Sequence, residues 1–375
     1  MNIREQTLNV LQYKQTDKIP LTPGGPREST LKRWQSEGLP EDADWFDYVM
    51  DALGINYPKS LNYQNHYVNI KMIPTYEEKI LKHENGHYIV QDWMGAITEI
   101  SDEFDYTYIR SPIDFVTRKW HKFPVASHED WIEMKKRYDP DDIDRYPYNI
   151  NVLNDLMADR EYISHLSLPG PFFQLREWLG FENLCVAFID QPVFVAEMIE
   201  FWRDFGLKII ERATSFIPVD CLDLYEDIAY KAHPMISPVM VREFISPVYK
   251  EWVKAAKQNA VPLICMDSDG YIDDLIPIWI ETGINVCEPI EVAAHNDIAL
   301  YNKKYGASMA YTGGIDKRAI AAGGNTMEAE VRRVTEPFLI KGGLIPGCDH
   351  GVPHDISLKN FIEYTGLLAK LTGWK

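Results

Sequence analysis

The stretch Pro262-Leu-Ile-Cys265-Met-Asp267-Ser-Asp269-Gly270 is an apolar run that ends in acidic residues and a glycine. The residues that follow, Tyr271 to Glu281, have helical spacing and stop at Thr282-Gly283, where glycine commonly terminates a helix. This pattern predicts a buried strand that delivers carboxylates to a strand-to-helix turn. In proteins built from alternating strands and helices, such turns lie on the face that carries the chemistry.

The same order of strand and helix recurs beyond about residue 150. Short apolar segments precede polar turns at residues 162–168, 221–225, 284–287, 307–311 and 343–345. Alternation of this kind is typical of an α/β protein with a parallel sheet and crossover helices. Because polar residues recur at every strand end rather than at one place, we expect a TIM (β/α)8 barrel rather than an open sheet.

Residues from about 56 to 125 follow a different pattern, in which apolar and polar residues alternate as they do in β-strands. We expect them to form a β-rich insertion in the N-terminal third that covers one mouth of the barrel. The sequence contains no clean repeat, low-complexity tract or linker. A single domain over residues 1–375 is therefore predicted.

Composition and charge exclude several classes of protein. The chain is 46% hydrophobic and has a formal net charge of −18 without a basic run, so we expect no nucleic-acid partner. No apolar run approaches the roughly 20 residues that cross a bilayer, and the first ten residues lack the apolar segment of a signal peptide. A cytoplasmic protein without a membrane partner is the expectation. Five cysteines without a CxxC pair predict free thiols.

Acidic, thiol and imidazole side chains follow the predicted strands and would meet at one barrel mouth. They are Glu226, Asp227, Asp267, Asp269, Glu288, Glu291, Asp316, Cys348, Asp349 and His350. Such a set is suited to zinc, which accepts oxygen, sulfur and nitrogen ligands. The zinc ligands that we expect are Asp267, Asp269, Cys348 and His350. Acid catalysis is the other role that we expect for Asp267 and Asp269, with Glu226 and Glu291 assisting.

Each of these residues has a structural alternative. Asp269, with Ser268, could cap the helix that begins at Tyr271, and Cys348 could be a small buried residue. Neighbouring residues of an extended chain point to opposite sides. Of Glu226 and Asp227, therefore, one should face the mouth while the other pairs with a base or caps a helix.

Aromatic side chains near the same strand ends would suit the wall of a cavity for a flat ligand. We expect Phe172, Phe173 and Tyr311 to contact the substrate together with Glu291, and ordinary core packing is the alternative for each aromatic residue. No GxGxxG, GxxxxGK[ST] or GxSxG motif is present. Dinucleotide, P-loop and serine-hydrolase functions therefore have little support.

Several motifs, taken in order, resemble the uroporphyrinogen decarboxylase superfamily nearly end to end, most weakly between about residues 56 and 125. They are Asp17-Lys-Ile-Pro20, Gly170-Pro-Phe-Phe-Gln-Leu-Arg176, Ile236-Ser-Pro238, Asp267-Ser-Asp-Gly270, Gly313-Gly-Ile-Asp316 and Gly347-Cys-Asp-His-Gly-Val-Pro353. The resemblance implies a TIM barrel and two functional branches. Decarboxylases of the family carry an arginine-rich loop for a substrate with many carboxylates. The corresponding loop here, Gly24-Gly-Pro-Arg27, has one arginine, which makes decarboxylation the weaker alternative.

The second branch contains corrinoid-dependent methyltransferases, some of which bind zinc through a His-x-Cys pair and a later cysteine. Asp267-x-Asp269 stands where that pair would fall, and Cys348 stands where the later cysteine would be. Carboxylate ligands make a harder site, better suited to an ether or alkoxide oxygen than to a thiolate.

The resemblance therefore implies a methyltransferase of the O-demethylase type. Such an enzyme would move a methyl group from a small methylated donor, expected to be an aryl methyl ether, to the cobalt of a separate corrinoid (cobalamin) protein. A homologue that only binds such a corrinoid protein, without catalysis, is the remaining alternative.

Overall fold

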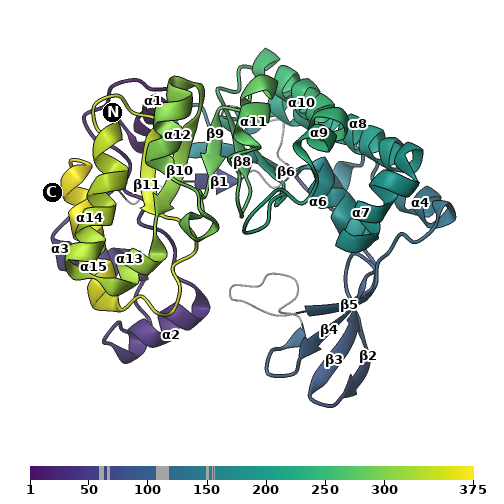
Figure 1. The fold of residues 1–375 in the computed structure, drawn as a ribbon, viewed down its shortest axis with the longest axis horizontal. Helices are drawn as coiled ribbons and strands as arrows, with labels where there is room; N and C mark the ends of the chain where they lie inside the picture. The colour runs from purple at the N-terminus through teal and green to yellow at the C-terminus, as the bar shows by residue number, and fades with distance from the viewer. Residues whose placement is uncertain (59–62, 66–67, 107–117, 149–151, 154, 156) are drawn as a thin grey trace.

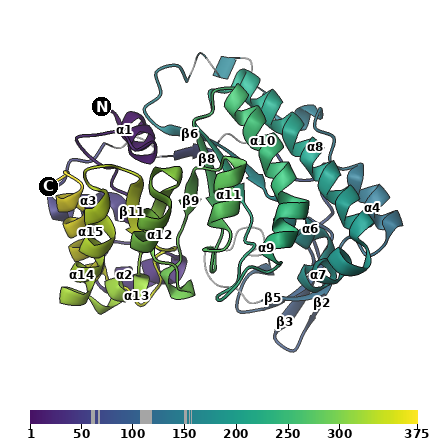
Figure 2. The same cartoon turned by 45° about the horizontal axis from the view of Figure 1, so that its top comes forward.

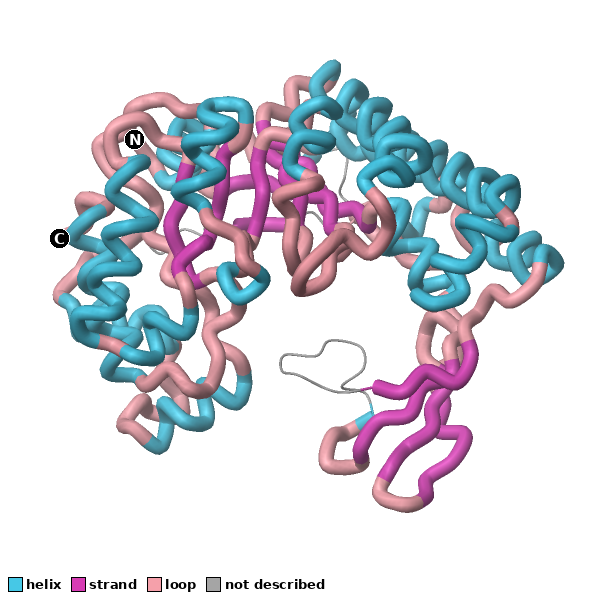
Figure 3. Tube along the Cα trace, in the orientation of Figure 1, coloured by secondary structure: helices cyan, strands magenta, loops and turns pink. Residues whose placement is uncertain are grey.

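The structure is a computed structural model that describes residues 1–58, 63–65, 68–106, 118–148, 152–153, 155 and 157–375. A parallel sheet lies at the centre of the molecule between groups of helices, and a second, antiparallel sheet projects from one side (Figures 1 and 3). No helix within these ranges is both long and apolar enough to cross a membrane.

Among the described residues, the central sheet has seven strands in the order β1-β6-β7-β8-β9-β10-β11, and all neighbours pair in parallel. The strands are β1 (Tyr63–Asn65), β6 (Ile163–Pro169), β7 (Cys221–Tyr225), β8 (Leu263–Asp267), β9 (Val286–Glu288), β10 (Ala310–Ile315) and β11 (Leu344–Cys348). Because spatial order follows chain order, each crossover connects neighbours. All these strands therefore end at the same edge of the sheet.

Helices join the strands and pack around the sheet, as the tilted view in Figure 2 shows. Those that follow β6 are α6 (Pro171–Leu179), α7 (Phe181–Asp190), α8 (Pro192–Phe216), α9 (Pro238–Met240), α10 (Ser246–Gln258), α11 (Ile276–Thr282), α12 (Ile298–Tyr305), α13 (Lys317–Ala322), α14 (Gly324–Thr335) and α15 (Leu358–Leu371). Short helical turns are η2 (Ile143–Arg145), η3 (Val241–Ile245), η4 (Val292–Ala294), η5 (Gly306–Ser308) and η6 (Glu336–Phe338). Their apolar faces and the outer face of the sheet form the main hydrophobic core.

Of the helices that precede β6 in the chain, the structure gives bounds within the described residues for the following. They are α1 (Ile3–Leu11), α2 (Glu28–Ser36), α3 (Trp45–Leu53) and α4 (His128–Lys135). Helix α1 lies at the amino-terminal end of the central strands, where Val10 and Leu11 pack in one cluster with Ile163, Leu263 and Ile345. It closes that end of the sheet interior with apolar side chains.

The predicted parallel α/β fold is confirmed. Residues 20–26 run beside β11, where the Cys348 N–H donates to the Pro23 carbonyl at 3.2 Å and Pro26 bridges Val352 in parallel. This is the position of a further strand. The described strand pairings do not join β11 to β1, so closure into an eight-stranded barrel stays a prediction.

A four-stranded antiparallel sheet lies within the stretch predicted to be a β-rich insertion. It has the order β2 (Lys79–Glu84), β3 (His87–Gln91), β4 (Ile97–Ser101) and β5 (Arg118–Lys122). The chain after β5 returns to α6, where the Val125 N–H donates to the Trp178 carbonyl at 3.0 Å. The sheet lies beside α6 and α7 (Figure 1). Residues 107–117 of the predicted insertion lie outside the described residues.

Candidate functional site

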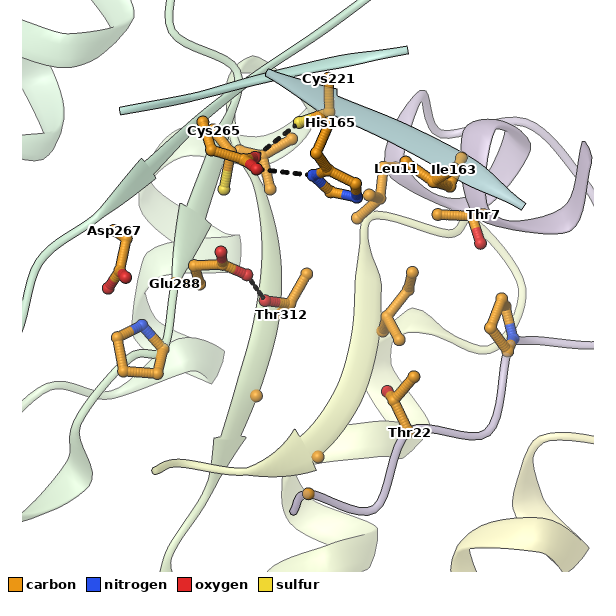
Figure 4. Close-up of a pocket in the computed structure, with 18 of the residues that line it drawn as sticks. Thr7, Leu11, Thr22, Ile163, His165, Cys221, Cys265, Asp267, Glu288 and Thr312 are labelled. Carbon is orange, nitrogen blue, oxygen red and sulfur yellow. Dashed lines mark hydrogen bonds and ion pairs between the residues drawn. The ribbon is translucent and has the colours of Figure 1, made fainter. Parts of the chain in front are cut away.

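The inner face of the central sheet borders a cavity of about 600 Å³. Alternate residues of a strand point to the same face, so each strand contributes every second side chain to the wall. Figure 4 labels part of the lining, including Ile163, His165, Cys221, Cys265, Asp267, Glu288 and Thr312. The lining also includes Asp223, Leu263, Val286, Ile345 and Cys348, with Asp227, Asp269 and His350 from the loops. Barrel interiors are usually filled by bulky branched residues. Short polar side chains at the middle positions leave this interior open.

The inner end of the cavity holds the deep cluster, which we define as His165, Cys221, Asp223 and Cys265. His165 Nδ1 lies 2.6 Å from Asp223 Oδ2, and the Cys221 thiol donates to Asp223 Oδ1 at 3.1 Å (Figure 4). Burial alone would lower the pKa of His165, but the hydrogen bonds to Asp223 and Cys221 outweigh it and raise the pKa to about 10. The imidazole is therefore a cation paired with Asp223 at neutral pH.

Cys265 faces Cys221 from the neighbouring strand. The interaction of the two thiols, followed by burial, raises the pKa of Cys265 well above its usual value. Cys265 is also the strand partner of Asp223 in the parallel register. Two thiols, one carboxyl group and one imidazole thus lie close together on three neighbouring strands, β6, β7 and β8.

Two carboxylic acids line the cavity from its middle to its mouth. Asp267 and Glu288 are strand partners, and Glu288 accepts a hydrogen bond from the Thr312 hydroxyl (Figure 4). Burial, then the nearby carboxylates of Glu288, Asp227 and Asp269, raise the pKa of Asp267 well above its usual value. Burial and Asp223 also raise the pKa of Glu288. Asp267 is thus a half-buried carboxyl group that borders open space and whose raised pKa favours the protonated form, the form that a general acid needs.

The mouth is the set Asp267, Asp269, Cys348 and His350, at the carboxyl ends of the strands. His350 Nδ1 accepts from the Gly351 N–H at 2.7 Å, so its Nε2–H donates to Asp269 Oδ2 at 3.1 Å. Burial acts to raise the pKa of Asp269, but the hydrogen bond from His350 and the charges of Lys317 and Arg27 outweigh it and lower the pKa.

Cys348 has the opposite character. Its side chain is buried against the cavity, and burial raises the pKa of the thiol to about 12. The mouth therefore holds a carboxylate at Asp269, a carboxyl group with a raised pKa at Asp267 and a neutral thiol at Cys348.

The four predicted zinc ligands all line this one cavity. They do not form a group whose ligand atoms lie within 4.8 Å of one another; among the described residues that group is His165, Cys221 and Asp223. Asp267 and Cys348 belong to β8 and β11, which β9 and β10 separate, and Asp269 is already paired with His350. Zinc binding at the mouth stays a prediction.

Glu226, predicted to be catalytic, is fully buried and does not line the cavity. Its carboxylate accepts from the Phe172 N–H at 2.9 Å and fills the space beside Gly170, where an added Cβ would lie 1.2 Å from Glu226 Oε2. Burial raises the pKa of Glu226 to about 8. Its neighbour Asp227 lines the cavity instead, as strand alternation requires of one of the pair.

The predicted substrate contacts also lie away from the cavity lining. Phe172 and Tyr311 are fully buried in the main core, because alternation on β10 turns Thr312 inward and Tyr311 outward. Phe173 packs edge-on against Tyr225 at 5.1 Å between ring centres. Glu291 accepts from the Gly270 N–H at 3.2 Å and lies 3.5 Å from Lys317 Nζ, which places it behind the mouth.

The residues that strand-end reasoning missed are His165, Cys221, Asp223 and Cys265. They lie within strands, not after them, and their signal in the sequence is a polar or thiol side chain at alternate positions of an apolar run. Cys221-Leu-Asp223 and His165-Leu-Ser167 both have this spacing. Period-two alternation places such residues together on one face of the sheet.

No protein-family model and no curated protein matches the sequence. Among solved structures, the chain is similar to a methyltransferase from Methanosarcina mazei over 99% of both chains, with a TM-score of 0.57 and 10% identity. A B12-independent methionine synthase from Shewanella sp. W3-18-1 aligns with 60% of this chain and 65% of its own, with a TM-score of 0.39 and 13% identity. At 10% identity the first likeness establishes a shared fold.

Proposed function

We propose that this protein is a methyltransferase that moves a methyl group from a small methylated donor to the cobalt of a separate corrinoid protein. Three observations support the proposal: the ordered motifs of the sequence, the fold shared with a methyltransferase over the length of both chains, and the acid-lined cavity. The observation that carries it is Asp267, a half-buried carboxyl group that lines the cavity and has a raised pKa.

The chemistry explains why a protonated acid is needed. Reduced cobalt, as the acceptor substrate, attacks the methyl carbon, a cobalt–carbon bond forms and the carbon–oxygen bond of the donor breaks. The electron pair stays on the departing oxygen, which must be protonated. Asp267 supplies that proton, and general acid catalysis of this kind contributes roughly 10²- to 10⁴-fold in rate.

The proposed donor is an aryl methyl ether, held with its ring between apolar walls. Ile163, Leu263, Val286 and Ile345 supply such walls toward the inner end of the cavity. A volume of about 600 Å³ falls within the usual range of small-molecule sites. Zinc, if bound at the mouth, would act as a Lewis acid on the same oxygen.

The lining disfavours the alternative of a porphyrinogen-type decarboxylase. Asp223, Asp227, Asp267, Asp269 and Glu288 line the cavity, and no lysine or arginine is among the described lining residues. A substrate with many carboxylates would meet a wall rich in carboxyl groups and no lysine or arginine clamp.

The test is to incubate the protein with a reduced corrinoid protein and a panel of methoxyarenes and methylamines. We expect the absorbance of methylcobalt to appear with at least one methoxyarene and the demethylated phenol to form in equal amount. Absence of methylcobalt absorbance with every compound of the panel would contradict the proposal. Release of carbon dioxide from uroporphyrinogen would establish the decarboxylase instead.

A further inference from the structure

We propose that His165, Cys221 and Asp223 bind a zinc ion inside the sheet, with the fourth coordination position facing the cavity. The three side chains are offered by two paired strands, because His165 on β6 is the register partner of Cys221 on β7. Their ligand atoms all lie within 4.8 Å of one another. This site is separate from the mouth, where the sequence alone predicts zinc.

The distances suit the ion. Tetrahedral zinc with bonds of roughly 2.0–2.3 Å separates its ligand atoms by about 3.3–3.6 Å. His165 Nδ1 and Asp223 Oδ2 are now 2.6 Å apart, and Cys221 Sγ and Asp223 Oδ1 are 3.1 Å apart. These two contacts run to different oxygens of Asp223, and the three ligand atoms that one ion would share lie within 4.8 Å of one another, so the side chains adjust from these contacts to the tetrahedral spacing when the metal replaces the protons.

The ligand set selects the ion. One imidazole nitrogen, one thiolate and one carboxylate oxygen form the mixed set that zinc accepts, whereas magnesium and calcium prefer oxygen ligands alone. On binding, the thiol proton of Cys221 and the Nδ1 proton of His165 leave to solvent, so the ligands become a thiolate and a neutral imidazole. Asp223 offers a carboxyl oxygen as the third ligand.

The surroundings leave room for a fourth ligand. The three residues line the cavity of about 600 Å³, and zinc with three protein ligands and an open position is the arrangement of catalytic sites. Cys265 faces Cys221 but falls outside the group whose ligand atoms lie within 4.8 Å. We therefore assign Cys265 no bond to the ion. The site stands independently of the methyl-transfer proposal.

Zinc titration of the full chain, after removal of metal by a chelator, tests the site. We expect about one equivalent of zinc to bind and Cys221→Ser, His165→Gln and Asp223→Asn each to weaken its affinity at least 10-fold. Cys287→Ser is the matched control, because Cys287 is a buried strand cysteine beside Met309 in the core. It should bind zinc as the unchanged protein does. Circular dichroism of each metal-free variant verifies folding.

Cobalt(II) substitution supplies a readout independent of affinity. We expect near-ultraviolet charge-transfer absorption from a thiolate bound to Co(II), absent in Cys221→Ser and retained in Cys287→Ser and Cys348→Ser. Loss of that absorption in Cys348→Ser with retention in Cys221→Ser would overturn the proposal and place the ion at the mouth. No zinc bound by the unchanged protein would overturn it as well.

Discussion

The deep cluster and the mouth are two ends of one cavity with different chemistry. At the mouth, His350 pairs with Asp269, and the neutral thiol of Cys348 lies three strands away from β8. In the deep cluster, the ligand atoms of His165, Cys221 and Asp223, on two neighbouring strands, lie within 4.8 Å of one another. Residues that each follow a strand can line one cavity and still lie too far apart to share a metal ion. Residues on paired strands in matching register are held close together, so register is the stronger evidence for a metal site.

Asp267→Asn should have the largest effect on methyl transfer. The amide fits the same space but cannot protonate the departing oxygen, so we expect kcat to fall by roughly 10²- to 10⁴-fold. Methylcobalt formation under saturating donor measures the change. Asp204→Asn, at a side chain that is 61% exposed on α8, is the control; equal rates for Asp267→Asn and the control would remove Asp267 from the reaction.

Removing the Cys221 thiol from the deep cluster should lower the zinc content of the protein, and any loss of activity should follow from that loss of zinc. If the bound zinc takes part in the reaction, Cys221→Ser should reduce zinc content and kcat together, and added zinc should restore part of both. Elemental analysis alongside the methyl-transfer assay measures this. A variant that lacks zinc but keeps full activity would show that the two ends of the cavity work independently.

Asp269→Asn should have a smaller effect, because Asp269 accepts from His350 without donating a proton. A hydrogen bond to a charged group contributes about 1.5–3 kcal/mol. Weakening the bond from His350 to Asp269 should leave the His350 side chain less firmly held at the mouth, so we expect KM for the donor to rise by about 10-fold or more. The value of kcat should change less than in Asp267→Asn. A fall in kcat as large as that of Asp267→Asn would make Asp269 a second proton donor.

Glu226→Gln should leave activity unchanged and alter the pH dependence of stability. Burial raises the pKa of Glu226 from about 4.5 to about 8. Below pH 4.5 both states hold the proton; between 4.5 and 8 only the folded state does, so the free energy of unfolding falls as pH rises through that window.

At about 1.4 kcal/mol per pKa unit, this loss reaches a few kcal/mol by pH 8. Glu226→Gln should remove it, so urea unfolding at pH 5 and pH 8 should show a smaller decrease for the variant than for the unchanged protein. An identical decrease in the two proteins would mean that Glu226 is ionised in the folded state.

The sequence predicted the parallel sheet well, because apolar strands followed by polar turns and glycine-ended helices are local signals. It also predicted that Asp267, Asp269, Cys348 and His350 lie near one another, and all four line one cavity. It did not predict that Glu226 would turn outward, because adjacent acidic residues leave the choice of face to the packing around Gly170. The deep cluster depends on register between β6, β7 and β8, which local patterns do not specify.

The most direct test of the account is zinc X-ray absorption on the loaded protein and on two variants, Cys221→Ser and Cys348→Ser. We expect one sulfur at about 2.3 Å and nitrogen or oxygen neighbours at about 2.0–2.2 Å in the unchanged protein. The sulfur should disappear in Cys221→Ser and remain in Cys348→Ser. A sulfur neighbour that persists in Cys221→Ser and is lost in Cys348→Ser would contradict the account.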